Sequence, residues 1–316
     1  MKDKGLILMV SILGALLAAP TASWADTRIE KELKLEPGGR FILKSDAGSV
    51  NVMGVPGAGA KIVITSRRDD LNSMMDFDFQ ESPGLVRVTG RRKGDFGWGH
   101  GISLSYEIEV PSQTSLEIKT GGGGIKISSI RRDSDLDTSG GGIEVGGFSG
   151  NLNAHTSGGG ITLREITGNS RVNTSGGGIK AESIEGSIEA RTSGGSIQMN
   201  RVSDDIVAVT SGGGIHIDRA GGRVEAKTSG GSVEVNFDRG NDKGGELATS
   251  GGSVRVGLDP GTNLDIDAST SAGHVNSSLP IKTSRVSKDS LLGSLGSGGA
   301  LLRLRSSAGS INIDAR

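Results

Sequence analysis

The sequence contains no cysteine, and aromatic side chains are scarce. Among its 316 residues only two are tryptophan, one is tyrosine and six are phenylalanine. The absence of cysteine excludes a disulfide framework, a thiolate metal site and the lipid-modified cysteine of a lipoprotein signal. The few aromatic residues cannot fill a bulky globular core, and they cannot form a continuous platform that stacks on sugars.

An excess of charge of either sign is also missing. The formal net charge is −1, with 35 Lys and Arg and 36 Asp and Glu mixed along the chain. Because no long basic run is present, nucleic acid is not an expected partner. No phosphate-binding Gly-Lys-Ser or Gly-Lys-Thr segment occurs, and no nucleophile elbow or zinc-type histidine pair either. We therefore predict no enzyme, no catalytic residue, no cofactor and no metal site.

The first residues differ from the rest of the chain. Lys2 and Lys4 precede an apolar stretch, residues 5–19, which a small-x-small segment at 23–25 follows. This pattern predicts a cleaved signal peptide over residues 1–25 and a mature start at Asp26. A retained membrane anchor is the alternative, but it needs about 20 apolar residues. Export without disulfides predicts a protein of the bacterial cell envelope, periplasmic or at the cell surface, with no membrane insertion after cleavage.

Glycine is abundant, with 54 residues, and much of it belongs to a repeat. The segment Thr-Ser-Gly-Gly-Gly-Ile recurs every 18 residues, identical or with small changes, at 138–143, 156–161, 174–179, 192–197, 210–215 and 228–233. Two later copies begin at Thr249 and Thr270. Self-similarity at a fixed short period is typical of a solenoid, in which each repeat buries its apolar face by stacking on the next.

Apolar residues alternate in two short runs within each repeat. One run starts at the Ile of the motif and the other nine residues later, and each predicts a strand with one buried face. We therefore predict an all-β, parallel β-solenoid of about 18 residues per rung, a flattened two-sheet β-roll or narrow right-handed β-helix. A three-sided left-handed helix would need apolar residues where the sequence has polar ones, such as Thr167, Glu185 and Arg191.

The repeat also divides the chain. We predict a signal peptide over 1–25, an N-terminal β-rich part of the solenoid over 26–119, the regular array over 120–277 and a C-terminal capping segment over 278–316. Such irregular end segments are expected, because the open ends of a solenoid expose unpaired strand edges.

Several phrases of the sequence resemble a known family. They are the segments 37–43, 47–52 and 104–111, together with the stacked Thr-Ser-Gly-Gly-Gly-Ile units. In these the chain resembles the bacterial "putative adhesin" β-strand-repeat family, a domain of unknown function, over most of its mature length. The resemblance implies a β-solenoid and an exported, surface-associated binding protein, and it brings no catalytic motif.

Two features of the sequence suggest contact surfaces. Phe96 and Trp98 follow a basic run in the glycine-spaced segment 91–101, where they could anchor a partner. Alternatively, they cover the apolar end of the rod, and this is the interpretation that we favour. Val207 and Val209 are predicted to face outward in columns that otherwise hold polar residues, so they could form a small docking spot.

The functional hypotheses follow from these features. The first is an adhesin-like module that binds a surface polymer or an envelope protein. The second is a structural rod that self-associates through its ends. A polysaccharide-active enzyme is third, because Asp218 and Glu234 are the closest outward acid pair. We expect the column of repeated threonines to be structural, and the repeats lack the aspartate of calcium-binding β-rolls.

Overall fold

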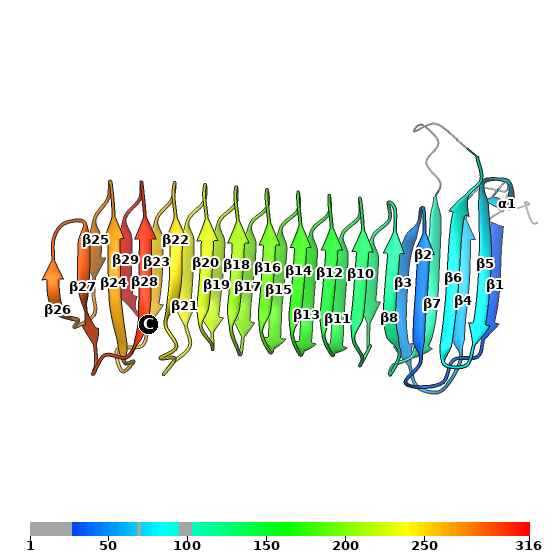
Figure 1. Ribbon diagram of the computed structural model, residues 1–316, viewed down its shortest axis with the longest axis horizontal. Coiled ribbons are helices and arrows are strands. Elements are labelled where there is room, and N and C mark those ends of the chain that lie inside the picture. The colour runs from blue at the N-terminus through cyan, green and yellow to red at the C-terminus, as the bar shows by residue number, and fades with distance from the viewer. Residues whose placement is uncertain (1–26, 68–70, 95–102) are drawn as a thin grey trace, which may run out of the picture.

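Two long β-sheets face each other and form a flat rod. The computed structural model describes residues 27–67, 71–94 and 103–316. The chain passes from one sheet to the other and back in each repeat, so the strands stack along the rod (Figure 1). This arrangement confirms the predicted all-β solenoid with two parallel-dominated sheets. The one helix of the described residues is α1, Leu71–Met74.

The first sheet, here called sheet A, has 14 strands. From the N-terminal end of the rod to the other end they are β1 (Thr27–Leu33), β4 (Ala60–Ser66), β7 (Leu104–Pro111), β3 (Ser49–Val55), β9 (Ile125–Ser128), β11 (Ile143–Ser149), β13 (Ile161–Thr167), β15 (Ile179–Glu185), β17 (Ile197–Val202), β19 (Ile215–Ala220), β21 (Val233–Phe237), β23 (Val254–Leu258), β29 (Ile311–Ala315) and β25 (Val275–Ser277).

The second sheet, sheet B, has 15 strands. In the same direction they are β5 (Met75–Ser82), β6 (Leu85–Arg92), β2 (Arg40–Ser45), β8 (Ser115–Thr120), β10 (Ser134–Thr138), β12 (Leu152–Thr156), β14 (Ser170–Thr174), β16 (Ile188–Thr192), β18 (Ile206–Thr210), β20 (Val224–Thr228), β22 (Gly245–Thr249), β28 (Ala300–Ser306), β24 (Leu264–Thr270), β27 (Ser290–Leu295) and β26 (Lys282–Val286).

The regular part of each sheet is parallel and in register by one repeat. In sheet A, Ile161 pairs with Ile179, and in sheet B, Val172 pairs with Ala190. Each pair is separated by 18 positions, so equivalent residues of successive repeats stack directly. This stacking is the reason that a single sequence period suffices to define the architecture.

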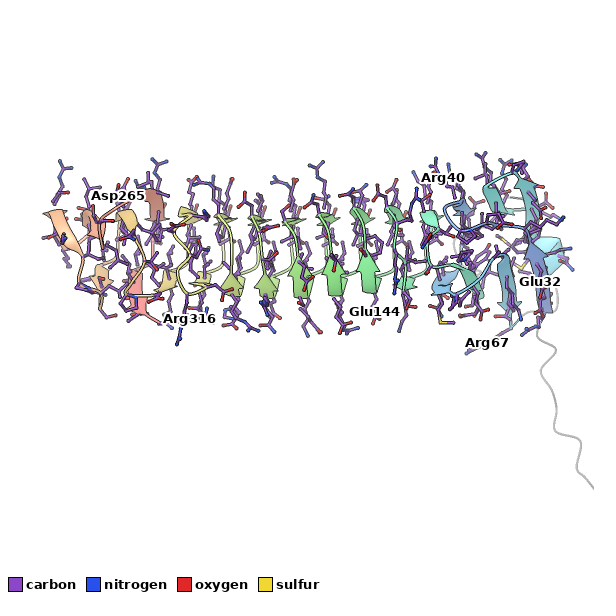
Figure 2. The ribbon with its side chains drawn as sticks, turned by 90° about the horizontal axis from the view of Figure 1, so that it is seen from below. Glu32, Arg40, Arg67, Glu144, Asp265 and Arg316 are labelled. Atoms are coloured by element: carbon purple, nitrogen blue, oxygen red, sulfur yellow. The ribbon has the colours of Figure 1, made fainter. Side chains whose placement is uncertain are left out.

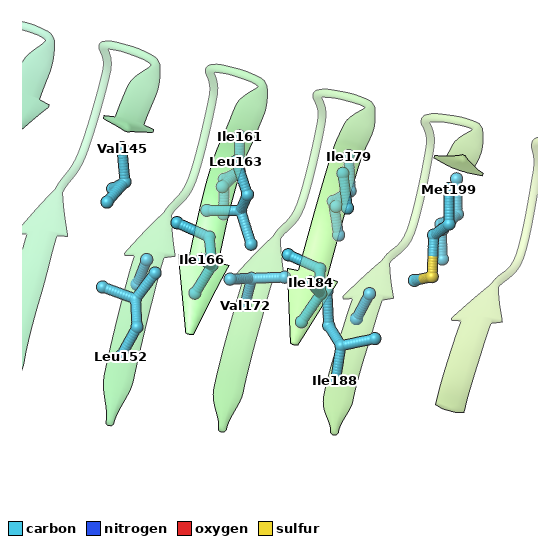
Figure 3. Close-up of a cluster of buried hydrophobic side chains, with 14 of the residues drawn as sticks. Val145, Leu152, Ile161, Leu163, Ile166, Val172, Ile179, Ile184, Ile188 and Met199 are labelled. Atoms are coloured by element: carbon cyan, nitrogen blue, oxygen red, sulfur yellow. The ribbon is translucent and has the colours of Figure 1, made fainter. Parts of the chain in front are cut away.

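The core lies between the two sheets and runs without interruption along the rod. Ile161, Leu163 and Ile166 of β13 are at most 1% exposed, and Val172 of the following strand in sheet B is completely buried. Figure 3 shows these side chains meeting between the sheets in successive rungs. Larger aliphatic side chains of sheet A pack against smaller ones of sheet B, for example Ala190. The inner faces of the two sheets therefore share one continuous core.

The threonine column stabilises the turns at one edge of the rod. Thr174 is buried, and its Oγ1 donates to the carbonyl oxygen of Gly159 in the preceding rung at 2.7 Å. Thr174 Oγ1 also accepts a 3.3 Å hydrogen bond from the amide of Gly177. Equivalent bonds to the neighbouring rung are made by Thr120, Thr138, Thr156, Thr192, Thr210, Thr228, Thr249, Thr270 and Ser306. The hydroxyls therefore connect the rungs and satisfy buried backbone groups.

One glycine of each motif is required by close packing of the rungs. A Cβ at Gly177 would lie 2.1 Å from the carbonyl oxygen of Gly159. The next position is less crowded, since a Cβ at Gly178 would lie 3.1 Å from the nearest atom, and the following repeat has Ser196 there. The opposite turn uses glycine differently: Gly168 has a φ of 119°, which favours glycine.

Near both ends of the rod the spatial order of the rungs departs from the order of the sequence. At the N-terminal end, β2 and β3 pair with β8 and β9 on one side and with β6 and β7 on the other. At the C-terminal end, β28 inserts between β22 and β24, and β29 inserts between β23 and β25.

This order differs from the capping segment expected over 278–316. Only the hairpin of β26 and β27 continues sheet B beyond β24, whereas residues 300–315 form an internal rung. After β22 and β23 the chain leaves one rung position unoccupied, because β24 lies two positions from β22 in sheet B. The last strands, which have the same apolar alternation as the repeats, occupy the position between them. At the other end, β1, β5 and α1 lie within the N-terminal β-rich part predicted over 26–119.

Candidate binding surface

The outer faces of the two sheets provide most of the exposed surface of the rod. Seen from below, side chains project outward from both sheets, with Arg40 and Asp265 on the face of sheet B and Glu144 and Arg316 on the face of sheet A (Figure 2). Phe96 and Trp98 lie outside the described residues. In the portion that the structure describes, no group of three or more His, Asp or Glu could hold a metal ion.

A shallow groove runs across four neighbouring strands on the outer face of sheet B, namely β12, β14, β16 and β18. We call it the sheet B groove; its outward-facing lining consists of Asn151, Asn153, Asn169, Arg171, Ser187, Glu189, Asp205 and Val207. The column at the turn holds the short polar side chains of Asn151, Asn169, Ser187 and Asp205. The neighbouring column, on the strands, contains polar, charged and apolar side chains, namely Asn153, Arg171, Glu189 and Val207. Because each strand contributes one residue to each column, the polar groups repeat at about 4.8 Å.

Hydrogen bonds between rungs orient the polar side chains at the edge of the groove. Asn151 donates its Nδ2 to Oδ1 of Asp133 at 3.3 Å, and the hydroxyl of Ser187 donates to Oδ1 of Asn169 at 2.7 Å. The amide of Arg223 donates to Oδ1 of Asp205 at 2.9 Å. The side chains of this edge are therefore held in place before any ligand binds, which lowers the entropic cost of binding.

The polar column was not among the contact surfaces predicted from the sequence, although the repeats contain it. Its members stand eight positions after the Ile of each motif, where the sequence has Asp133, Asn151, Asn169, Ser187 and Asp205. Alignment of the repeats at that position shows an uninterrupted column of short polar residues that could have indicated the groove.

Val207 and Val209 lie on β18, on the same outer face. Both are half-buried, and they pair with charged residues of the adjacent strands: Val207 with Glu189 and Glu225, and Val209 with Arg191. Val207 forms one end of the sheet B groove. The two valines thus belong to a strand without charged residues, and the strands on both sides of it carry charged residues. Their role as contact residues remains a prediction.

Ion-pair clusters lie on both sides of this uncharged strand. Glu189 accepts from Arg191 at 2.8 Å and from Arg171 at 2.9 Å, and these two cations hold its pKa below the usual value, Arg191 more strongly. On the other side Lys227 contacts Glu246 at 2.9 Å and Glu225 at 3.0 Å, which raises the pKa of its ammonium group. Such exposed pairs contribute little stability, but they keep the face ordered.

The outer face of sheet A contains a longer series of ion pairs. Glu144 pairs with Arg164 and, at 3.8 Å, with Lys126, and Arg164 also contacts Glu182 at 3.3 Å. Lys180 and then Arg164 lower the pKa of Glu182. Along this part of sheet A three basic and two acidic side chains contact one another, so most of the charge is compensated and little is left to attract an ionic ligand.

Each acid of the candidate pair in the enzymatic hypothesis lies beside a basic side chain. Asp218 contacts Arg316 at 3.4 Å and Arg219 at 3.9 Å, and Glu234 lies 3.5 Å from Nδ1 of His216. All of these side chains are substantially exposed. A glycosidase instead needs one carboxyl group whose pKa is raised by its surroundings, and the arrangement here does not provide an apolar environment for either acid.

Tyr106 is the one deeply buried titratable side chain of the described residues with a shifted pKa. Burial raises the pKa of its phenol to about 12, an effect that the hydrogen bond with Ser45 partly offsets. The Ser45 hydroxyl lies 2.7 Å from the phenol oxygen and also donates to the carbonyl of Ala47, so Tyr106 is the donor between the two. The phenol lies inside the core and serves the structure.

The chain matches one family model along most of its length. The model, described as Toastrack DUF4097, matches residues 43–314 and confirms the resemblance inferred from the repeats. No curated protein matches the chain. Within the described part, no helix is long and apolar enough to cross a membrane.

Several solved structures are similar to this chain at low sequence identity. A putative adhesin from Bacteroides fragilis is 10% identical, with a TM-score of 0.47, covering 91% of this chain and 97% of that one. A putative lipid binding protein from Parabacteroides distasonis is 14% identical, with a TM-score of 0.41, covering 92% and 96%. A putative cell adhesion protein from Clostridium sporogenes is 12% identical, with a TM-score of 0.22, covering 92% and 100%.

Proposed function

Since the chain belongs to the Toastrack DUF4097 family, we propose that it is an exported, non-enzymatic binding module of the bacterial cell envelope. In this adhesin-like role the rod presents the sheet B groove to an extended surface polymer or to a segment of an envelope protein. The observation that carries the proposal is the groove itself, with its repeated polar side chains next to the uncharged strand β18.

The chemistry of the groove favours binding over catalysis. Its edge offers amide, hydroxyl and carboxylate groups in a fixed column, and the adjacent ion pairs hold Arg171 and Glu189 in position. A ligand with regularly spaced hydroxyl or amide groups could form one hydrogen bond per rung, and Val207 would contribute an apolar contact at one end. Individually weak contacts then add along an extended ligand.

Export is the second part of the proposal and depends on residues 1–25. The expected mature start, Asp26, directly precedes β1, so cleavage there would leave every strand of the rod intact. Fractionation of cells, with the mass of the recovered protein, tests this part. A protein that stays in the cytoplasm with its first 25 residues attached would refute it.

Binding is tested by capture of envelope polysaccharides and proteins on the immobilised mature chain. We expect the double variant Asn169→Ala, Arg171→Ala to reduce capture about tenfold or more, equivalent to about 1.4 kcal/mol. Val207→Ser should reduce it less, because it removes one apolar contact. The matched control is Gln198→Ala with Asn200→Ala on β17, which is equally exposed but on the opposite sheet.

Each outcome assigns the function differently. Loss of capture with the groove variant but not with the sheet A control supports the proposal. Equal capture by all of these variants would refute the groove, and loss with Trp98→Ala alone would move the site to segment 91–101. Turnover of a captured polysaccharide that disappears with Asp218→Asn would refute the non-enzymatic assignment.

A further inference from the structure

The two ends of the rod have complementary shapes. Sheet A stops at β25, in the same rung as β24, but sheet B continues with β27 and β26. At the N-terminal end the relation is reversed, because sheet A continues one strand further, to β1, than sheet B, which stops at β5. Figure 1 shows β26 at one extremity of the rod and β1 and β5 at the other.

The strand β26 has the properties of an uncovered edge. All five of its residues are exposed. The pairing with β27 places Lys282 and Arg285 on the outer face of sheet B, opposite Ser294 and Leu292, and Val286 on the inner face, opposite the buried Leu291. Val286 is 66% exposed because sheet A has no strand opposite β26. Such an edge can pair with the strand of another chain.

The strand β5 at the opposite end has the complementary chemistry. Its outward side chains include Asp76 and Asp78, and its inward ones include Met75, Phe77 and Phe79. It contains three acidic residues and no basic one, whereas β26 contains two basic residues and no acidic one. Asp76 is 73% exposed, although Lys93 lies 3.8 Å away.

The strand directions allow β26 and β5 to join. β26 is antiparallel to β27, which is antiparallel to β24, so β26 runs in the main direction of sheet B. β5 is antiparallel to β6 and runs in the opposite direction. A contact between the two edges would therefore be an antiparallel pair, with basic side chains opposite acidic ones on the outer face, an arrangement that stabilises such pairs.

We propose that one copy of this chain docks onto a second copy head to tail, through antiparallel pairing of β26 with β5. In this arrangement the overhanging β1 of the second copy lies opposite β26, so that the inner face with Val286 meets Ile29 and Leu33, which are partly buried residues packed against the core. Lys31 lies between them on the same face, with its Nζ 5.8 Å from the centre of the Phe79 ring. The segment with Leu279 and Ile281 covers the inner face of the sheet where sheet A lacks a strand. A contact between two different surfaces does not close on itself, so repetition gives filaments.

Analytical ultracentrifugation of the mature chain over a range of concentrations tests the contact. We expect concentration-dependent association that weakens as salt is added, because exposed charges are screened. The variants Lys282→Glu with Arg285→Glu, and separately Asp76→Lys with Asp78→Lys, should each weaken self-association about tenfold or more. Since all four side chains are exposed, circular dichroism and thermal melting should be unchanged.

A mixture of the two charge-reversed variants gives the decisive result. The reversed β26 of one variant is complementary to the reversed β5 of the other, so mixing should restore the association that is weakened in each variant alone. A chain that stays monomeric at every concentration would overturn the proposal, and so would association that survives both reversals. The sheet B groove lies far from both ends, so its binding is measured independently on the monomeric variants.

Discussion

At the scale of single residues, the turn beside the threonine column depends on one hydroxyl and on one missing side chain. Thr174 and Gly177 illustrate both requirements, and the same pair recurs in almost every rung. The hydroxyl is required because buried carbonyl groups need partners. The glycine is required because neighbouring rungs approach within contact distance of its Cα. Serine takes the place of threonine at Ser306, where its hydroxyl makes the same kind of bond to the neighbouring rung.

The packing at Gly177 leads to a first prediction. Gly177→Ala would place a Cβ 2.1 Å from the backbone of the preceding rung, so the rungs must separate. We expect it to lower the free energy of unfolding by about 1–3 kcal/mol, as for other overpacked sites. Gly178→Ser is the matched control and should change stability by less than about 0.5 kcal/mol. Urea denaturation measures both, and equal stabilities of the two variants would contradict the packing argument.

The hydroxyl of Thr174 leads to a second prediction. Thr174→Val keeps the shape of the side chain but leaves the carbonyl of Gly159 and the amide of Gly177 without this partner. We expect a loss of about 1–3 kcal/mol in the free energy of unfolding. Thr174→Ser keeps the oxygen and should lose clearly less. A serine variant that is as unstable as the valine variant would show that the methyl group dominates.

Tyr106 allows a direct titration, because it is the only tyrosine of the chain. Burial raises the pKa of its phenol to about 12, so the folded state favours the neutral form. Its contribution to stability is therefore present below the ordinary tyrosine pKa of about 10 and is lost as the pH rises through about 12. We expect the tyrosinate absorbance to appear only at this pH. Ionisation of the folded protein near pH ~10 would contradict the burial of the phenol.

At the scale of elements, the rungs near the ends are held by strands distant in sequence. The last two strands of the chain, β28 and β29, lie inside the rod and separate the rung of β22 and β23 from the rung of β24 and β25. The threonine column continues through this insertion: Ser306 donates to Gly252 and Thr270 donates to Gly309. The hydrogen bonds of the threonine column thus connect rungs that are neighbours in space, even where these rungs are not consecutive in the chain.

Removal of residues 300–316 should therefore detach a part of the rod that precedes the deleted segment in the sequence. Without β28, β24 loses its parallel partner and with it the connection to β22. We expect hydrogen exchange to become fast in 264–277 and to stay slow in β14 and β16, which serve as the internal control. Unchanged protection of β24 in the shortened chain would contradict the inserted rung.

At the scale of the whole molecule, the regular part of the rod is a one-dimensional stack. Each rung contacts its two neighbours, and the core continues from one to the next. In such arrays stability is approximately a sum over rungs and interfaces. The flat outer faces and the two unlike ends are properties of this stack, and the proposed groove and the proposed end contact use different parts of it.

The stack predicts that a whole rung can be removed. Deletion of residues 161–178 would place Ile143 beside Ile179 with the same register, because both sheets repeat after 18 residues. We expect a folded rod that is shorter by about 4.8 Å, which small-angle X-ray scattering can detect. Deletion of 161–169 alone is the control, since it would bring a strand of one sheet into the other. Equal stability of the two shortened chains would contradict the stacking.

The sequence alone predicted the solenoid, the two strands per rung and the structural role of Thr174 and its equivalents. It could do so because equivalent residues of successive repeats stack on one another, so one period describes many contacts. It also indicated that Val207 and Val209 face outward. The polar column at Asn151 and Asn169 was present in the sequence but is recognised only when it is seen beside a groove.

The way in which the rod ends is set by the tertiary structure alone. The insertion of β28 and β29, and the pairing of β2 and β3 with β8 and β9, join strands far apart in the chain, whereas β26 with β27 and β5 with β6 form local hairpins. No sequence period relates these strands. Their order is therefore set by the unpaired strand edge that each of them pairs with and by the apolar face that each of them covers.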